Sequence, residues 1–83
     1  MLHIKVLGSG CANCKRLEAV VRQTVDHLGL PAEIEKVTDY AAIMQYHVLS
    51  TPGLVVNEQL VSAGRIPAER EISAWLTSAP PAA

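Results

Sequence analysis

Residues 2–29 read LHIKVLGSGCANCKRLEAVVRQTVDHLG, and this stretch decides the fold. Its first six residues are a short apolar run with β-branched side chains. The run ends at Gly8-Ser9-Gly10, which predicts a strand followed by a tight turn. From Ala12 onward, apolar residues recur at helical spacing and predict an amphipathic helix of about four turns, which Gly29 and Pro31 end. Two cysteines therefore lie where a strand gives way to a helix.

Beyond Pro31 the chain contains three further strand patterns and two further helix patterns. These are a strand over Glu33–Val37, a helix from Tyr40 to about Tyr46, strands over Leu54–Val56 and Gln59–Ala63, and a last helix that begins near Pro67. Asn57-Glu58 separates the last two strands, which predicts an antiparallel hairpin. We expect the order β-α-β-α-β-β-α, with the first two strands parallel because a helix connects them. The fold class is α/β, with a four-stranded mixed sheet between helices.

The helical spacing also predicts which side chains face the core. In the first helix one apolar stripe contains Cys14, Leu17, Val21, Val25 and Leu28. In the second helix Ile43 and Met44 are expected to turn inward. Cys14 therefore faces the edge of the core, while Cys11, one turn earlier, is expected at the exposed mouth of the helix.

Length and charge exclude several classes of protein. With 83 residues the chain forms one domain over residues 1–83, and a frayed tail is expected from about residue 78. The net charge is −1, and no long block of like charges suggests a nucleic-acid partner. No apolar run approaches the roughly 18 to 20 residues of a membrane-spanning helix. The first residues lack the apolar segment of a signal peptide, so we expect a cytoplasmic protein, as a monomer.

Cys11 and Cys14 are the two cysteines of the sequence, and stability is a poor reason to join them. A bridge between them closes so short a loop that the chain-entropy model gives about 1.9 kcal/mol, below the ~3 kcal/mol of a 15-residue loop. Two thiols separated by two residues suit either a disulfide that opens and closes or a clamp for a soft metal. Cys11 precedes a helix whose unpaired N–H groups stabilise a thiolate, and Cys14 is sheltered. This asymmetry favours thiol-disulfide exchange, with an outer nucleophile and an inner resolving thiol.

Three segments together resemble a known family. They are Gly8-Ser9-Gly10-Cys11-Ala12-Asn13-Cys14-Lys15, Ser50-Thr51-Pro52-Gly53 and Val61-Ser62-Ala63-Gly64-Arg65-Ile66-Pro67. The chain is similar to the small redox-active disulfide proteins of the thioredoxin superfamily over nearly its whole length. The resemblance implies a minimal thioredoxin-like or glutaredoxin-like core. It also implies that Thr51-Pro52 is a cis-proline loop that faces the two cysteines and docks the substrate.

The sequence departs from the family pattern at a few positions away from the cysteines. His47 and Asn57-Glu58 stand where the family tends to have glycine, which accepts a positive φ freely. Ala68 replaces a serine that often caps the last helix. Ala12 and Asn13 stand between the cysteines where thioredoxins and glutaredoxins usually have a proline, so redox potentials do not transfer to this chain.

The reading that we favour is a thiol-disulfide oxidoreductase-like protein, with Cys11 and Cys14 catalytic and Thr51 and Pro52 binding the substrate. Its partners would be a protein disulfide or thiol client and an unidentified electron donor. The redox-active disulfide requires no bound cofactor.

Two alternatives stay open. One is a module that binds a soft metal through Cys11 and Cys14. The other is a noncatalytic adaptor that uses the groove beside Thr51-Pro52 to bind proteins. His3, His27 and His47 lack the spacing of metal ligands, and we assign them structural or surface roles.

Overall fold

The computed structural model describes residues 2–8, 12–48 and 50–78. In that part of the chain strands and helices follow one another in the predicted order β-α-β-α-β-β-α. The elements are β1 (Leu2–Leu7), α1 (Ala12–Leu28), β2 (Ala32–Val37), α2 (Tyr40–Met44), β3 (Gly53–Val56), β4 (Gln59–Ala63) and α3 (Glu69–Ser78). Most of the tail expected from about residue 78 lies outside the described residues.

The four strands form one mixed sheet in the order β2-β1-β3-β4. β1 and β2 are parallel and in register from Leu2 beside Ala32 to Leu7 beside Val37. β3 runs antiparallel to β1 and to β4, with a register shift between Leu54 and Val55 in the pairing with β4. The connection through a helix explains the parallel pairing of β1 with β2, and the two-residue turn explains the antiparallel pairing of β3 with β4. The predicted α/β class is confirmed.

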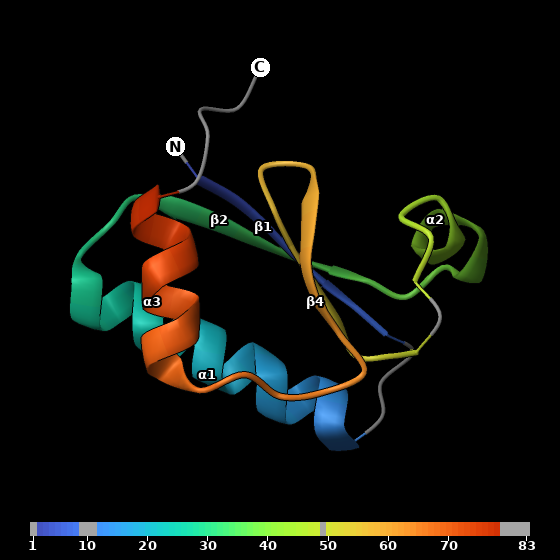
Figure 1. The fold of residues 1–83 in the computed structure, drawn as a ribbon, viewed down its shortest axis with the longest axis horizontal. Coiled ribbons are helices and arrows are strands. Elements are labelled where there is room, and N and C mark those ends of the chain that lie inside the picture. The colour runs from blue at the N-terminus through green and yellow to red at the C-terminus, as the bar shows by residue number, and fades with distance from the viewer. Residues whose placement is uncertain (1, 9–11, 49, 79–83) are drawn as a thin grey trace.

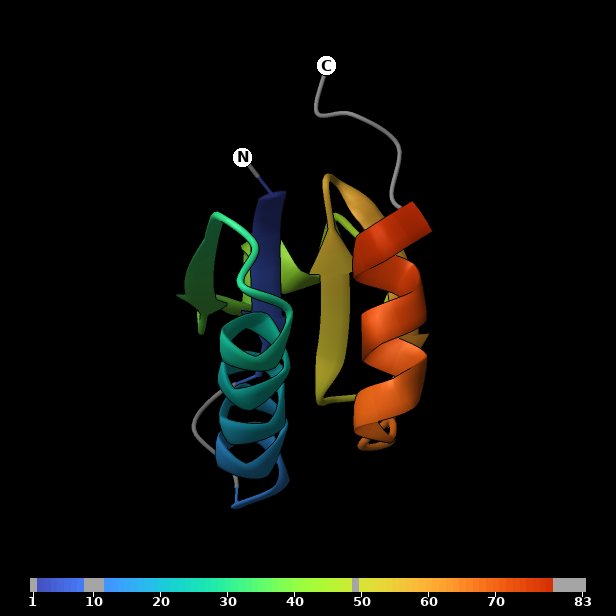
Figure 2. The same ribbon diagram turned by 90° about the vertical axis from the view of Figure 1, so that its left-hand side faces the viewer.

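The helices cover both faces of this sheet. α1 and α3 lie on one face, and α2 lies on the other (Figures 1 and 2). Side chains that alternate along the strands therefore enter two separate apolar clusters. The cluster beneath α1 and α3 contains Ile4, Val6, Leu17, Val21, Leu54, Val56, Ile72 and Leu76. The cluster beneath α2 contains Leu7, Val37, Ile43, Val48 and Val55.

One of the expected core positions is wrong, and another, Val25, packs against the core but is only partly buried. Met44 is 41% exposed because α2 has a single turn and directs Ile43 into the core instead. In α1 the fourth fully buried position is Thr24, whereas Val25 is only partly buried. The Thr24 hydroxyl donates a 2.8 Å hydrogen bond to the Val20 carbonyl, which satisfies its polar group inside the core.

Positive φ angles occur at the non-glycine positions where the family resemblance implied glycine. His47 has φ 58°, and Asn57 and Glu58 of the hairpin turn have φ 49° and 70°. Two successive positive φ angles match the twist of the flanking strands in a tight hairpin. The Asn57 side-chain oxygen accepts a 2.9 Å hydrogen bond from the His3 backbone N–H, which ties the turn to β1. In the described part of the chain, no helix is long and apolar enough to cross a membrane.

Candidate redox site

The candidate site lies at the edge of the sheet where β1 and β2 end and β3 begins. Gly8, which follows β1, donates a 3.0 Å hydrogen bond to the Val37 carbonyl at the end of β2. At the same edge Leu7 pairs with Gly53, the first residue of β3. The loop before β3, which contains Thr51 and Pro52, is therefore brought next to the segment between β1 and α1.

Gly8 makes a close approach to Cys14 possible. A Cβ atom built on Gly8 would lie 2.2 Å from the Cys14 Sγ and 3.9 Å from the Thr51 Cβ. The first distance is far below any real contact between those atoms, so glycine is required here on steric grounds. The two expected site residues Cys14 and Thr51 thus meet around Gly8.

Cys14 belongs to the buried stripe of α1, as its spacing predicted. It is 6% exposed, and it is disulfide-bonded in this structure. Cys11, the other cysteine of the sequence, lies outside the described residues. Its expected place at the helix mouth and its role as nucleophile therefore remain predictions.

The Thr51-Pro52 segment is anchored at its proline and open at its threonine. The Thr51-Pro52 peptide bond is cis. Pro52 is fully buried, and its carbonyl accepts a 2.8 Å hydrogen bond from the Gly64 N–H, which follows β4. Thr51 is exposed. A partner chain can therefore reach Thr51 while Pro52 keeps the loop in place.

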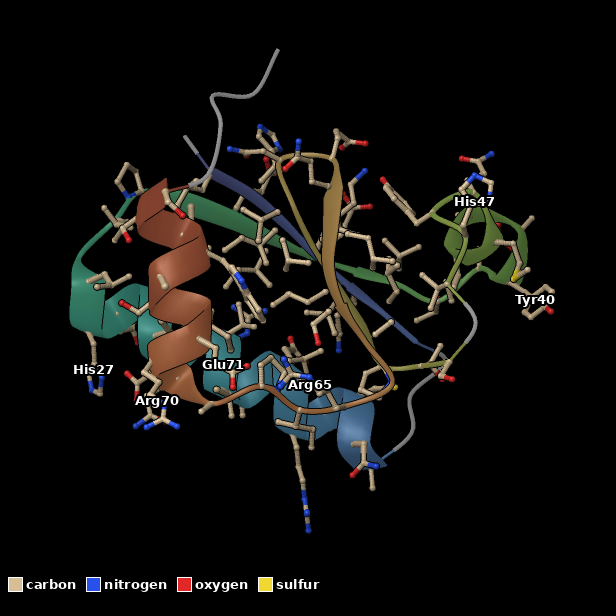
Figure 3. All side chains as sticks on the ribbon, viewed as in Figure 1. His27, Tyr40, His47, Arg65, Arg70 and Glu71 are labelled. Carbon is tan, nitrogen blue, oxygen red and sulfur yellow. The ribbon has the colours of Figure 1, made fainter. Side chains whose placement is uncertain are left out.

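A groove begins at Thr51 and continues along α2, and its extent along α2 was not expected from the sequence. Its volume is about 450 Å³, and every residue that lines it is uncharged: Thr38, Tyr40, Ile43, Met44, Val48, Ser50 and Thr51. Tyr40, which is 74% exposed, projects outward from α2 (Figure 3). Tyr40–Met44 is an uninterrupted apolar run, longer than one helix turn can bury. This run was the feature of the sequence that could have predicted exposed apolar surface at the groove.

A second, smaller cavity lies beside Cys14 and is lined by charged side chains. Its volume is about 70 Å³, and its walls are Val6, Gly8, Cys14, Lys15, Glu18, Lys36 and Thr38. Glu18 follows Cys14 by four residues, so both side chains lie on the same face of α1. The sequence analysis assigned no role to Glu18 or Lys36, although the four-residue spacing was visible.

Glu18 is ionised and held from two sides. Its Oε2 accepts hydrogen bonds of 2.9 and 3.2 Å from the Arg22 guanidinium, and its Oε1 lies 3.6 Å from the Lys36 Nζ. The hydrogen bond from Arg22 is the main reason that the pKa of Glu18 is lowered, and Lys36 acts in the same direction. The edge of the site next to Cys14 is therefore charged, while the edge along α2 is not.

The three histidines do not come together. His27 on α1 and His47 after α2 lie at opposite ends of the molecule (Figure 3). His3 contacts Glu33, and His27 contacts Glu69. Within residues 2–8, 12–48 and 50–78, no group of three or more His, Cys, Asp or Glu side chains is placed to hold a metal ion.

Comparison with known proteins gives consistent results for family and fold. Residues 2–77 match the family model described as thioredoxin domain. The chain is 38% identical over 77 residues to a thioredoxin of Methanothermobacter thermautotrophicus, an alignment that covers 93% of this chain and 100% of that protein. It is also 38% identical over 78 residues to a thioredoxin of Methanocaldococcus jannaschii, covering 94% of this chain and 90% of that protein.

Solved structures support the fold alone. A thioredoxin-2 described as a component of the malaria parasite protein secretion machinery superposes with a TM-score of 0.68 at 12% identity, covering 93% of this chain and 82% of that one. The germline-specific thioredoxin Deadhead of Drosophila melanogaster gives a TM-score of 0.66 at 16% identity, covering 95% and 81%. The arrangement of the sheet and helices is shared with these proteins despite the low identity.

Proposed function

The chain belongs to the thioredoxin-domain family, and from this premise we propose that it exchanges disulfides with a protein client through Cys11 and Cys14. Family membership supports an oxidoreductase-like function in general. The observation that carries the specific proposal is Cys14, which is buried, disulfide-bonded and next to the exposed Thr51. A sulfur in that position is sheltered from solvent but close to a surface that a client can reach.

The two thiols take different roles in this proposal. Cys11 is the nucleophile, and it directly precedes Ala12, where the unpaired N–H groups of α1 begin. Such groups stabilise a thiolate and lower the pKa of a thiol. Cys14 is the resolving thiol, because a buried sulfur on the apolar stripe is protected from outside disulfides and attacks only a mixed disulfide formed within reach.

The client binds along Thr51 and the uncharged groove next to it. An extended client segment can form backbone hydrogen bonds with an exposed loop at a sheet edge, as in strand addition. Tyr40 and Met44 supply exposed apolar surface in continuation of that loop. An apolar, uncharged lining fits a polypeptide better than a small charged thiol such as glutathione.

The proposal is tested by trapping. Cys14→Ser leaves Cys11 without a resolving thiol, so mixed disulfides with client proteins should accumulate and appear as bands that a reductant removes. Cys11→Ser is the matched control and should trap nothing. If Cys14→Ser also fails to form mixed disulfides with a disulfide-containing protein such as insulin, the exchange function is wrong. If client binding persists after both substitutions, the noncatalytic adaptor is supported instead.

A further inference from the structure

The segment between β4 and α3 lies against the loop that we propose to bind the client. The Gly64 N–H donates a 2.8 Å hydrogen bond to the Pro52 carbonyl. A Cβ atom built on Gly64 would lie only 3.0 Å from the Ser50 Cβ, and Gly64 has φ 76°, so this close approach favours glycine. Ser50 and Pro52 flank Thr51. The position of Gly64 therefore helps to fix the place of the exposed threonine.

Arg65 follows Gly64 directly, and it is the single charged residue of the sequence between Val61 and Pro67. Its Nη1 lies 2.8 Å from the Glu71 Oε2. The two side chains point toward one another across the start of α3 (Figure 3). This ion pair, the Arg65–Glu71 pair, therefore joins the segment after β4 to the last helix.

Glu71 is a well-fixed attachment point for the arginine. Its Oε2 atom is buried, although the side chain as a whole is 35% exposed. It lies in the first turn of α3, where the positive end of the helix favours a carboxylate. The next residue, Ile72, is fully buried in the cluster beneath α1 and α3. The backbone that presents the carboxylate is thus anchored in the core.

The Arg65–Glu71 pair restrains a segment that is otherwise held only at its ends. At one end Gly64 follows β4, and at the other Pro67 is fully buried. Between them the Arg65 side chain is 54% exposed, and an arginine in such a place would extend freely into water if it had no partner. The pair removes that freedom next to the residue that contacts the docking loop.

We propose that the Arg65–Glu71 pair positions Thr51 for client docking. The pair keeps Gly64 against Pro52, and it thereby holds the loop in the geometry that an extended client segment binds. This inference rests on the proposed function, because it concerns the same docking loop. Arg65 and Glu71 act through Gly64, so they are positioning residues.

A positioning role predicts a particular kinetic change. A client that binds by backbone hydrogen bonds needs the loop in one place, and any ordering that must occur on binding weakens the affinity. Loss of the pair should therefore raise KM for a protein client and leave kcat unchanged. A role in overall stability alone would instead lower the fraction of folded protein and affect all amide protons and all reactions alike.

Amide hydrogen exchange in the full-length oxidised protein tests the link to Gly64. In Arg65→Met the exchange rate of the Gly64 N–H should rise about fivefold or more, because local opening becomes more frequent. The reference is the Asn57 N–H, which donates a 2.8 Å hydrogen bond to the His3 carbonyl at the other end of the sheet. Its rate should change by less than about twofold.

Two further variants control for the charge. Arg65→Lys keeps the positive charge beside Glu71, and Arg70→Met removes an exposed cation from the same helix. In both, the Gly64 exchange rate should stay within about twofold of the wild-type rate. An equal rise in Arg70→Met would show that the effect comes from net charge, and it would overturn the proposal.

Insulin reduction with dithiothreitol as donor tests the link to docking. Arg65→Met and Glu71→Gln should each raise KM for insulin about fivefold, with kcat within about twofold of the wild type. Opening of the Cys11–Cys14 disulfide by dithiothreitol alone should be unchanged. The double variant should have no higher KM than the single variants, because each of them already removes the pair.

The measurements separate the possible failures. An unchanged Gly64 exchange rate in Arg65→Met, or an equal rise at Asn57, would overturn the link between the pair and the docking loop. An unchanged KM in both single variants, or effects that multiply in the double variant, would overturn the positioning role. The Gly64 measurement needs no client, so a wild-type protein that fails to reduce insulin indicates a failure of the proposed function instead.

Discussion

At each of two ends of the sheet a carboxylate lies between other polar groups, but only one of these carboxylates lies beside a cysteine. At the hairpin end, defined by Asn57 and Glu58, the Lys5 Nζ donates to the Tyr46 hydroxyl at 2.8 Å and to Glu58 at 2.9 Å. The Tyr46 hydroxyl donates to the other Glu58 oxygen at 3.0 Å, which closes the network. At the site end, defined by Gly8, Cys14 and Thr51, the Glu18 network borders a cavity instead.

The contrast separates a network that is closed on itself from one that borders Cys14. At the hairpin end the hydrogen bonds that Lys5 donates to Tyr46 and Glu58 raise the pKa of Lys5, and the hydrogen bonds that Glu58 accepts from Lys5 and Tyr46 lower the pKa of Glu58. Each charge there is matched by a neighbour, so the network joins β1, the segment after α2 and the hairpin turn. At the site end a wall of the cavity is Cys14 itself. Substitutions at the hairpin end should therefore change stability alone, whereas substitutions at the site end should also change disulfide exchange.

The largest effect is expected for Gly8→Ala at the site end. The new Cβ would lie 2.2 Å from the Cys14 Sγ, so the sulfur or the strand must move. We expect a loss of about 1–3 kcal/mol in the free energy of unfolding and at least a tenfold loss of disulfide exchange. Chemical denaturation and an insulin reduction assay measure the two effects.

Gly29→Ala is the matched control for this substitution. Gly29 has φ 64° and no atom within 4 Å of the position that a Cβ would take. Alanine should therefore cost about 1 kcal/mol through its backbone conformation, with exchange unchanged. Equal losses of exchange in the two variants would show that Gly8 has no special relation to Cys14.

A smaller effect, on stability alone, is expected for Lys5→Met at the hairpin end. The variant loses the bonds to Tyr46 and Glu58, and since this site is partly exposed we expect a loss of about 1 kcal/mol with wild-type exchange. A clear decrease in exchange would contradict the separation of the two ends.

The same network predicts an acid dependence. The pKa of Glu58 is lowered on folding, so its contribution to stability is present above the ordinary value of 4.5 and is lost as the pH falls through the lowered pKa. In Lys5→Met this contribution should largely disappear. Denaturation curves from pH 7 to pH 2 would show a smaller acid-induced loss than in the wild type, and parallel curves would refute the prediction.

The smallest effect is expected for His47→Gly, next to Tyr46. His47 is exposed and has φ 58°, a conformation that glycine adopts more readily. Part of this gain is offset by the greater flexibility of glycine in the unfolded chain, so we expect a stabilisation of about 0.5 kcal/mol. Thermal unfolding measures it, and a loss of stability would indicate that the imidazole has a contact of its own.

Much of the fold followed from turn residues and apolar spacing. Gly29 and Pro31 end α1 where the sequence predicted, and the hairpin turn lies at Asn57 and Glu58 as expected. These predictions were correct because they depend on local backbone chemistry, which a single sequence contains. Met44 was misplaced because the length of a short helix, and therefore the face it buries, depends on packing against the sheet.

The candidate site was predictable only in part. Cys14 and the Thr51-Pro52 loop could be identified from the motif and the resemblance. The closeness of Gly8 to Cys14, and the pairing of Glu18 with Lys36, arise only when β1, α1 and β2 are assembled. These contacts join residues on different elements and carry no local signal. Glu18 and Lys36, which look like solvated surface residues in the sequence, therefore become part of the site's surroundings.

The central claim is that Cys11 and Cys14 form a redox-active pair, and equilibration with glutathione tests it most directly. The full-length protein is incubated in buffers of increasing ratio of reduced to oxidised glutathione, free thiols are alkylated under acid quench, and mass spectrometry measures the fraction of Cys11–Cys14 disulfide. Metal content is measured on the same purified sample. We predict one reversible two-electron transition without a stoichiometric metal. Failure to observe any transition, with one tightly held metal ion per chain, would contradict the account and favour the soft-metal module.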